Sequence, residues 1–150
     1  MNDWQGNILE DSDDILELLR NSHRIAVLGI KPDSASSKPA HRVPKFLQQQ
    51  GYEIVPVPTY YPDVAEILGQ KVYRTLAEIP GDIDIVDVFR RPGDIPEHVP
   101  DMLAKRPRAV WFQLGIRNDT AAQEIAAAGI LVVQDRCLKI ERQRLVRRSP

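Results

Sequence analysis

The chain has 150 residues, 43% of them hydrophobic, which is enough to bury one substantial apolar core. Its 20 basic and 21 acidic side chains leave a formal net charge of −1, so composition argues against nucleic-acid and membrane partners. The longest apolar runs are too short to span a bilayer, and the acidic start MNDWQGNILEDSDD lacks the features of a signal peptide. We therefore expect one cytoplasmic domain over residues 1–150, with its core at about 10–145.

The chain is expected to open with an amphipathic helix followed by a strand. Apolar residues recur at roughly helical spacing over residues 13–21, and Ser12 or Asp13 can cap this helix. The run RIAVLGI at 24–30 is nearly continuous, apolar and rich in β-branched residues, which is typical of a strand buried on both faces. The same pattern recurs at residues 53–57, 83–89, 109–114 and 130–134.

Helical segments are expected between these strands. They lie at residues 39–50, 64–68, 76–79, 95–105 and 120–128, and a basic helix CLKIERQRLVRR ends the chain. TLAE at 75–78 matches a capping box, and Gly51 and Gly129 suit the left-handed position after a helix. Pro44 lies inside the second helix and predicts a kink there.

The alternation of strands and helices predicts right-handed βαβ units. We expect an α/β, Rossmann-like three-layer fold with helices on both faces of a five-stranded parallel sheet. Numbered along the chain, the strands are expected in the order 3-2-1-4-5. Ligands bind such sheets beyond the carboxyl ends of the strands, where the order reverses. This order places the ligand between the first and fourth strands, beside the loop that follows the first.

That loop, VLGIKPDSASSKPAHRV at 27–43, carries one glycine, Gly29, where a dinucleotide fingerprint has three. The second strand also ends in VPVPTYY, without the carboxylate that holds ribose hydroxyls, so both features argue against an NAD site. The loop instead offers cations and hydroxyls at a helix N-terminus, where anions bind. The candidates are Lys31, Ser34, Ser36, Ser37, Lys38, His41 and Arg42. The alternative is a solvated Ser/Lys loop that binds nothing.

Other polar residues follow the third and fourth strands. Arg90 is favoured for phosphate, and Arg91 for solvent or an acidic neighbour, although both suit a surface ion pair. Gln113 could bind a ligand amide or satisfy a loop backbone. His23 and His98 are assigned to the surface, and no His or Cys pair has metal-ligand spacing, so no metal site is expected.

Four segments in order resemble a known family: IAVLGIKPDSASSKPAHRVPKFLQQQGYEIVPVPT, DIVDVFRRP, AVWFQLGIRND and VVQDRCLKIE. They are similar to the small stand-alone CoA-binding proteins of the CoA-binding domain family, relatives of the nucleotide-binding domain in the succinyl-CoA synthetase α-subunit. The resemblance spans about residues 10–145 and implies that CoA or an acyl-CoA binds across the strand ends. The synthetase's phosphorylated histidine belongs to a second domain, so the resemblance implies no catalysis here.

Carried over by motif, the resemblance assigns the first loop to phosphates. Gly29, Ile30 and Lys31 would border the diphosphate or pantetheine, with Gly29 providing clearance for the ligand. The residues that would hold phosphate are Ser36, Ser37, His41 and Arg42.

The resemblance assigns the ends of the second and third strands to adenosine. Val57 and Pro58 would lie under it, where the family usually reads PVNP and this chain reads PVPT. After the third strand come Val88, Phe89 and Arg90, with Phe89 or its backbone against adenine and Arg90 near the ribose 3′-phosphate. Independently of the resemblance, Gln113 could hydrogen-bond a pantetheine amide or satisfy a loop backbone.

Three functions stay open at this point. The leading hypothesis is a non-catalytic CoA-binding module, which could form a homodimer or serve a partner enzyme. The second is a small CoA- or nucleotide-using enzyme with Cys137 as nucleophile, since Cys137 lies beside Arg136 and near a helix start. No His or Asp partner can be placed beside this thiol, so an inert role is favoured for it. The third, an NAD(P)-dependent oxidoreductase, is disfavoured by the missing glycines.

Overall fold

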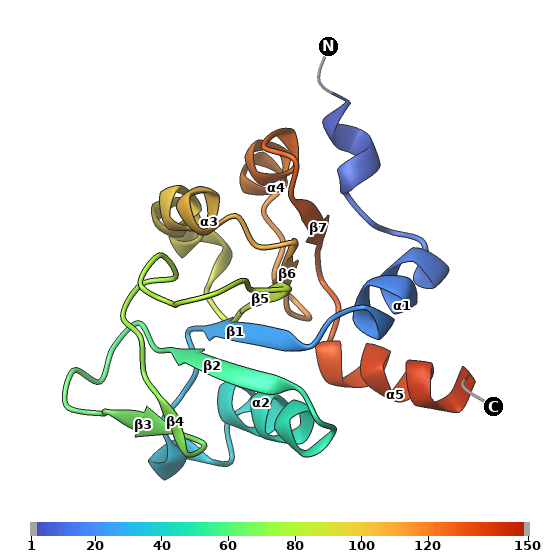
Figure 1. The fold of residues 1–150 in the computed structure, drawn as a ribbon. Coiled ribbons are helices and arrows are strands. Elements are labelled where there is room, and N and C mark those ends of the chain that lie inside the picture. The colour runs from blue at the N-terminus through green and yellow to red at the C-terminus, as the bar shows by residue number, and fades with distance from the viewer. Residues whose placement is uncertain (1–2, 149–150) are drawn as a thin grey trace.

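The computed structural model describes residues 3–148, and its centre is a five-stranded parallel sheet (Figure 1). The strands are β1 (Arg24–Leu28), β2 (Glu53–Val57), β5 (Ile85–Val88), β6 (Ala109–Phe112) and β7 (Leu131–Val133). All five predicted strands are present. The α/β Rossmann-like class is therefore confirmed.

The predicted strand order is wrong at one position. The sheet runs β2-β1-β5-β6-β7, so the third long strand, β5, pairs with β1 instead of lying beyond β2. The far side of β2 is covered by a small antiparallel hairpin of β3 (Glu66–Ile67) and β4 (Gln70–Lys71). The order consequently reverses between β1 and β5, and the loops after these two strands are neighbours.

The helices cover both faces of the sheet. Below it lie α1 (Ser12–Arg20), α2 (Pro39–Gln49) and α5 (Leu138–Arg148), and above it lie α3 (Val99–Lys105) and α4 (Asp119–Ala127) (Figure 1). Two apolar clusters result. One beneath α3 and α4 includes Val86 and Phe112, and the other against α1, α2 and α5 includes Ile85 and Trp111. Neighbouring residues of one strand enter opposite clusters because side chains alternate across a strand.

Three predicted helices differ from the structure. Residues 64–68 enter the β3–β4 hairpin, because Leu68 and Gly69 both have positive φ (54° and 74°) and make a tight turn. Residues 76–79 form a turn, in which Thr75 Oγ1 accepts the Glu78 N–H as half of the predicted capping box. The predicted helix at 95–105 is split into the short 3-10 helix η4 (Pro96–His98) and α3, since Pro96 and Pro100 lack backbone donors.

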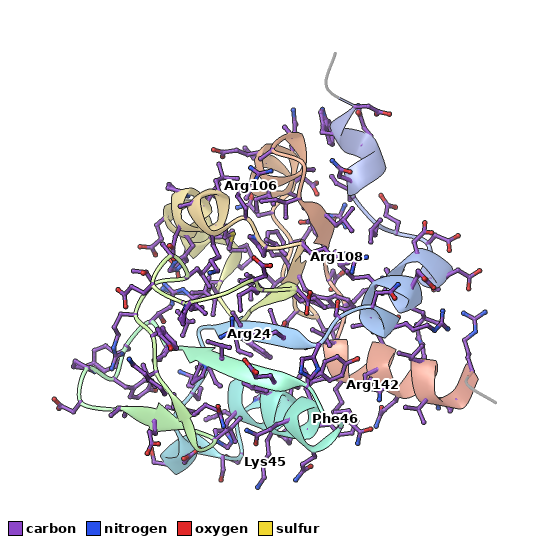
Figure 2. All side chains as sticks on the ribbon, viewed as in Figure 1. Arg24, Lys45, Phe46, Arg106, Arg108 and Arg142 are labelled. Carbon is purple, nitrogen blue, oxygen red and sulfur yellow. The ribbon has the colours of Figure 1, made fainter. Side chains whose placement is uncertain are left out.

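Basic side chains hold together the amino-terminal edge of the sheet. Arg24, at the start of β1, binds the Glu53 carboxylate and the Pro80 carbonyl oxygen. Arg142, on α5, lies over the Tyr52 ring at 5.4 Å (Figure 2). None of the helices within residues 3–148 is long and apolar enough to cross a membrane.

Candidate functional site

A cleft of about 760 Å³ opens at the carboxyl ends of β1, β2 and β5. Leu28 and Pro58, at the ends of β1 and β2, provide its apolar floor. The loop after β2 contributes Tyr60, which is 72% exposed, and η4 contributes His98 on another side. The cleft lies at the point where the strand order reverses, and its volume is in the range of small-ligand sites.

Gly29 brings two loops into contact at this edge. Its φ is +87°, and a Cβ at this position would lie 2.3 Å from the carbonyl oxygen of Phe89. Because this oxygen belongs to the backbone, it cannot move away by a side-chain rotation, as a flexible side chain could. Gly29 thus has a structural role: glycine lets the loop after β1 pack against the loop after β5.

The loop between β1 and α2 exposes several of the predicted phosphate ligands. Ser36, Ser37 and Arg42 are exposed, and Arg42 donates to the Ser37 carbonyl oxygen at 2.7 Å. Lys31 is half-buried, with Nζ 3.5 Å from the Tyr61 hydroxyl and 5.7 Å from the centre of its ring. Through Lys31, this loop therefore contacts Tyr61 in the segment that follows β2.

His41 is turned away from this exposed surface. It is 2% exposed, and its Nε2 lies 2.7 Å from Oδ1 of Asp33 in the same loop. Asp33 Oδ1 also accepts the Leu68 N–H, and the hydrogen bond with His41 is the main cause that lowers the pKa of Asp33. His41 thus ties α2 to the loop and, through Asp33, to the β3–β4 hairpin.

Several positions of the predicted site have side chains that lie in the core. Ile30, Val57 and Val88 are each at most 1% exposed. Phe89 is partly buried, and its ring packs against the cluster shared with α2. Backbone groups at these strand ends bond to one another: the Val57 carbonyl oxygen accepts the Gly29 N–H at 2.9 Å, and the Phe89 N–H donates to the Leu28 carbonyl oxygen at 2.9 Å. These residues therefore hold the strand ends together.

Arg74 shapes the wall of the cleft and was missed by sequence reasoning. Its guanidinium donates to the carbonyl oxygens of Tyr60, Tyr61, Pro62 and Val64 at 2.8 to 3.2 Å. These bonds fold the loop after β2 around one side chain. The sequence shows only an isolated arginine, and nothing in its spacing indicates these partners.

We expect Arg74→Ala to loosen this loop. The variant loses several charge-assisted hydrogen bonds at an exposed site, and we expect it to unfold about 1–3 kcal/mol more easily than the wild type. Amide hydrogen exchange should rise over residues 60–64. Arg106→Ala is a suitable control, because the Arg106 side chain donates to the carbonyl oxygen of Ala128, and neither residue lines the cleft. Unchanged exchange over residues 60–64 would contradict this role of Arg74.

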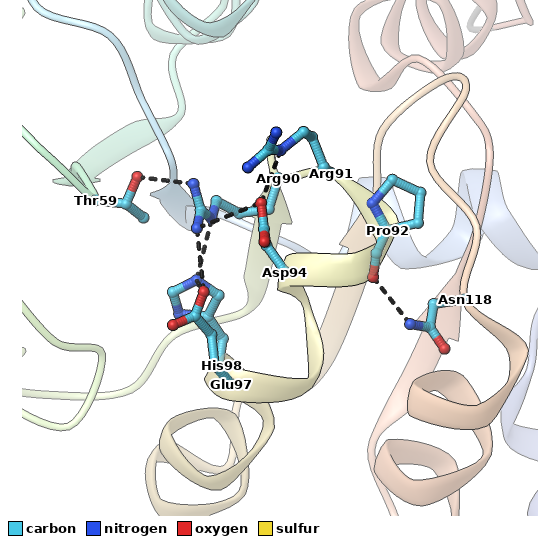
Figure 3. Close-up of polar contacts among 8 residues, drawn as sticks. All are labelled: Thr59, Arg90, Arg91, Pro92, Asp94, Glu97, His98 and Asn118. Carbon is cyan, nitrogen blue, oxygen red and sulfur yellow. Dashed lines mark hydrogen bonds and ion pairs between the residues drawn. The ribbon is translucent and has the colours of Figure 1, made fainter.

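Arg90 crosses the cleft from the end of β5 (Figure 3). Its Nε donates to His98 Nε2 at 3.1 Å, and its terminal nitrogens donate to Thr59 Oγ1 and Glu97 Oε1, each at 3.2 Å. Arg91 points elsewhere, is 87% exposed and pairs with Asp94, which agrees with the expected acidic neighbour. The assignment of His98 to the surface is wrong, since its side chain is 18% exposed and bonded to Arg90.

Gln113 and Asp87 form a buried pair away from the cleft. Gln113 is 4% exposed and donates from Nε2 to Asp87 Oδ1 at 2.8 Å. The other carboxyl oxygen of Asp87 is buried without a partner. Burial raises the pKa of Asp87 to about 8, against the lowering effect of the Gln113 hydrogen bond. Asp84, three residues earlier, instead accepts the backbone N–H groups of His23 and Arg24.

Cys137 lies outside the cleft. It is half-buried, directly before α5, in a separate groove of about 460 Å³ over the ends of β6 and β7. In the same groove Arg136 and Arg144 both pair with Glu141. Among residues 3–148, no group of three or more His, Cys, Asp or Glu side chains could hold a metal ion.

The fold defines a Rossmann-like protein with a cleft at the reversal of its strand order. The chain matches the family model described as CoA binding domain over residues 23–143 and belongs to this family, which confirms the resemblance. The uncharacterized protein YneT of Bacillus subtilis is 40% identical over 129 residues, covering 85% of this chain and 90% of that protein.

Solved structures show the same fold. A Thermus thermophilus protein, cell-free ID.343, is 39% identical with a TM-score of 0.82, covering 91% of this chain and 99% of that one. A hypothetical protein from Pyrococcus horikoshii OT3 is 34% identical with a TM-score of 0.81, covering 91% and 93%. A dinucleotide-forming acetyl-coenzyme A synthetase of Ca. Korarchaeum cryptofilum, at 20% identity and a TM-score of 0.64, shares the fold over 78% of this chain and 26% of its own length.

Proposed function

We propose that this protein binds CoA or an acyl-CoA in the cleft above β1, β2 and β5, as a single-domain module without catalysis of its own. The observation that carries the proposal is the cleft itself. It combines an apolar floor with a half-buried guanidinium, Arg90, at the strand ends where the sheet order reverses. Membership of the CoA binding domain family supports CoA as the ligand.

In this proposal the adenosine lies on the apolar side of the cleft. Leu28 and Pro58 lie beneath the base, and the exposed Tyr60 ring offers a surface for stacking. Val57, Val88 and Phe89 support this side of the cleft from the strand ends. Arg90 then faces the ribose, where CoA carries its 3′-phosphate.

The diphosphate lies over the loop between β1 and α2. Lys31, Ser36, Ser37 and Arg42 provide its charged and hydroxyl contacts, and the positive end of the α2 dipole favours the negative charge of the ligand. His41 supports this loop through Asp33 from the buried side. The Nε2 group of Gln113 can bind the pantetheine only if it breaks its hydrogen bond to Asp87. We therefore assign Gln113 the structural role of holding the Asp87 side chain.

Thermal unfolding with CoA, acetyl-CoA, dephospho-CoA, NAD, NADP and ATP tests the proposal. A ligand at about a hundred times its dissociation constant adds roughly 2.7 kcal/mol to the free energy of unfolding. For a chain of this length such a gain raises Tm by about 5–11 °C. We expect CoA and acetyl-CoA to give this shift and NAD to give none. A Tm unchanged by CoA would refute the proposal.

Two adjacent arginines provide a matched pair of variants for the same assay. Arg90→Ala should weaken CoA more than dephospho-CoA, because Arg90 faces the phosphorylated ribose, whereas Arg91→Ala should leave both affinities unchanged. Cys137→Ser should also bind CoA like the wild type, since Cys137 lies in another groove. A CoA-dependent turnover that disappears in Cys137→Ser would favour the enzyme hypothesis instead.

A further inference from the structure

We propose that His98 is the positioning residue of the CoA cleft: it holds Nε of Arg90 so that the two terminal nitrogens of the guanidinium remain available for the ribose phosphate. This inference rests on the proposed function. It adds a residue that determines selectivity for the phosphorylated ribose, and it makes that selectivity depend on the protonation of one histidine.

The contact between the two side chains requires a neutral imidazole. Arg90 has only donors, and its Nε–H is directed at His98 Nε2 at 3.1 Å, so Nε2 must carry a lone pair and Nδ1 the proton. A doubly protonated ring has no acceptor to offer. Figure 3 shows this contact between Arg90 and His98. His98 ends η4, where its backbone N–H donates to the Ile95 carbonyl oxygen at 2.9 Å and holds the backbone in place.

The other partners of Arg90 are easier to displace. Thr59 is exposed and the Glu97 side chain is 62% exposed, and each accepts one bond from a terminal nitrogen at 3.2 Å. The Asp94 carboxylate lies farther away, with Oδ2 at 3.8 Å from Nη2 of Arg90. Exposed ion pairs add little stability, whereas a phosphate can accept two parallel bonds from one guanidinium. The phosphate therefore takes the places of Thr59 and Glu97, and His98 keeps the plane of the fork in position.

Charged groups from several elements face His98. Burial lowers the pKa of His98 and the charge of Arg90 lowers it further, while Glu97, Asp101 and Asp94 raise it. Arg74 lines the same cleft, with its donors on backbone carbonyls. Because the pKa is lowered, His98 is neutral at pH 7 and gains its proton only below its ordinary value of 6.5. Acidification then removes the acceptor and places a positive charge against Arg90, so the phosphate contact is lost at low pH.

The test measures the dissociation constants of CoA and dephospho-CoA by titration calorimetry between pH 5 and pH 8. Their ratio, dephospho-CoA over CoA, reports the contribution of the 3′-phosphate. His98→Ala should lower this ratio about tenfold at pH 7.5, the loss of one hydrogen bond to a charged group. His98→Gln, whose amide oxygen can still accept from Nε, should keep the ratio.

The pH profiles separate positioning from packing. The phosphate itself gains a proton near pH 6, so the ratio falls on acidification in every variant. It should fall more steeply in the wild type than in His98→Gln, which has no titrating ring. His23→Gln, a change at an exposed histidine elsewhere, should follow the wild-type profile. Melting curves without ligand check that each variant is folded.

Three results would overturn the inference. One is a wild-type ratio retained by His98→Ala at pH 7.5, and another is an identical pH profile for the wild type and His98→Gln. The third is a ratio that rises on acidification, which would show that a protonated His98 binds the phosphate directly. If wild-type protein binds CoA but any of these holds, the proposed function stands and the role of His98 falls. If it binds no CoA at any pH, both are refuted.

Discussion

Asp87→Asn is expected to stabilise the folded protein at pH 7 by as much as about 4 kcal/mol, because it removes a buried group that resists ionisation. Asp87 is 0% exposed on β5, between Val27 and Trp111 of the neighbouring strands. Oδ1 of its carboxyl group accepts a hydrogen bond from Gln113 Nε2. Asparagine has nearly the shape of the protonated acid and accepts the same bond, so the packing around it should not change.

The sign of the effect follows from proton binding. In the folded protein the pKa of Asp87 is about 8, well above its ordinary value of 3.8, so the folded state keeps a proton that the unfolded chain releases. Between about pH 4 and pH 8 the wild type therefore loses roughly 1.4 kcal/mol of stability for each pH unit, or about 4 kcal/mol over the three units up to pH 7. Asparagine does not titrate and avoids this loss.

Urea unfolding of both proteins at pH 4.5, 6 and 7.5 measures the difference. The gain from Asp87→Asn should be small at pH 4.5 and largest at pH 7.5. Asp84→Asn is the matched control, since Asp84 accepts two backbone N–H groups and its replacement should destabilise the protein. Parallel pH profiles for wild type and Asp87→Asn would show that the carboxyl group is ionised in the folded state.

The strands were predictable because burial on both faces leaves a direct pattern in the sequence. Runs such as IAVL and AVWF are apolar throughout, and the alternation of strands with helical segments implies parallel pairing. The position of β5 was not predictable in this way, because the same run suits a place beside β1 or beyond β2. The hairpin that covers β2 has strands of two residues each, too short for any periodic signal.

The site was predictable to the extent that it depends on strand ends. Arg90 was proposed because it comes just after a buried strand, and the carboxyl ends of parallel strands share one edge, whereas Pro58 was proposed from the family resemblance; both line the cleft. Arg74 and His98 reach the cleft from elements that sequence placed wrongly or treated as surface. Their partners are backbone carbonyls and another side chain, which leave no pattern along the chain. Asp87 did leave one, as a lone carboxylate within the apolar run IVDV, but the run does not reveal its partner Gln113.

The contact between the loops after β1 and β5 makes Gly29→Ala the second large effect that we expect. At φ +87° an alanine is strained by about 1–2 kcal/mol, and its Cβ would also meet the Phe89 carbonyl oxygen at 2.3 Å. Relief requires movement of the end of β5, so the total loss should reach about 3 kcal/mol or more. Because Arg90 follows Phe89 directly, the same movement should displace Arg90 and weaken CoA binding.

Gly115→Ala separates the backbone strain of a positive φ from the clash with the Phe89 carbonyl oxygen. Gly115 has φ +84° at the same edge of the sheet, but a Cβ there would meet nothing within 4 Å. This variant should therefore show the backbone strain alone, about 1–2 kcal/mol in urea unfolding, and should bind CoA like the wild type. Equal losses of stability in the two variants, or unchanged CoA affinity in Gly29→Ala, would mean that the loops after β1 and β5 do not depend on this contact. A larger loss in Gly29→Ala, together with weaker CoA binding, would tie the glycine of the first loop to the position of Arg90.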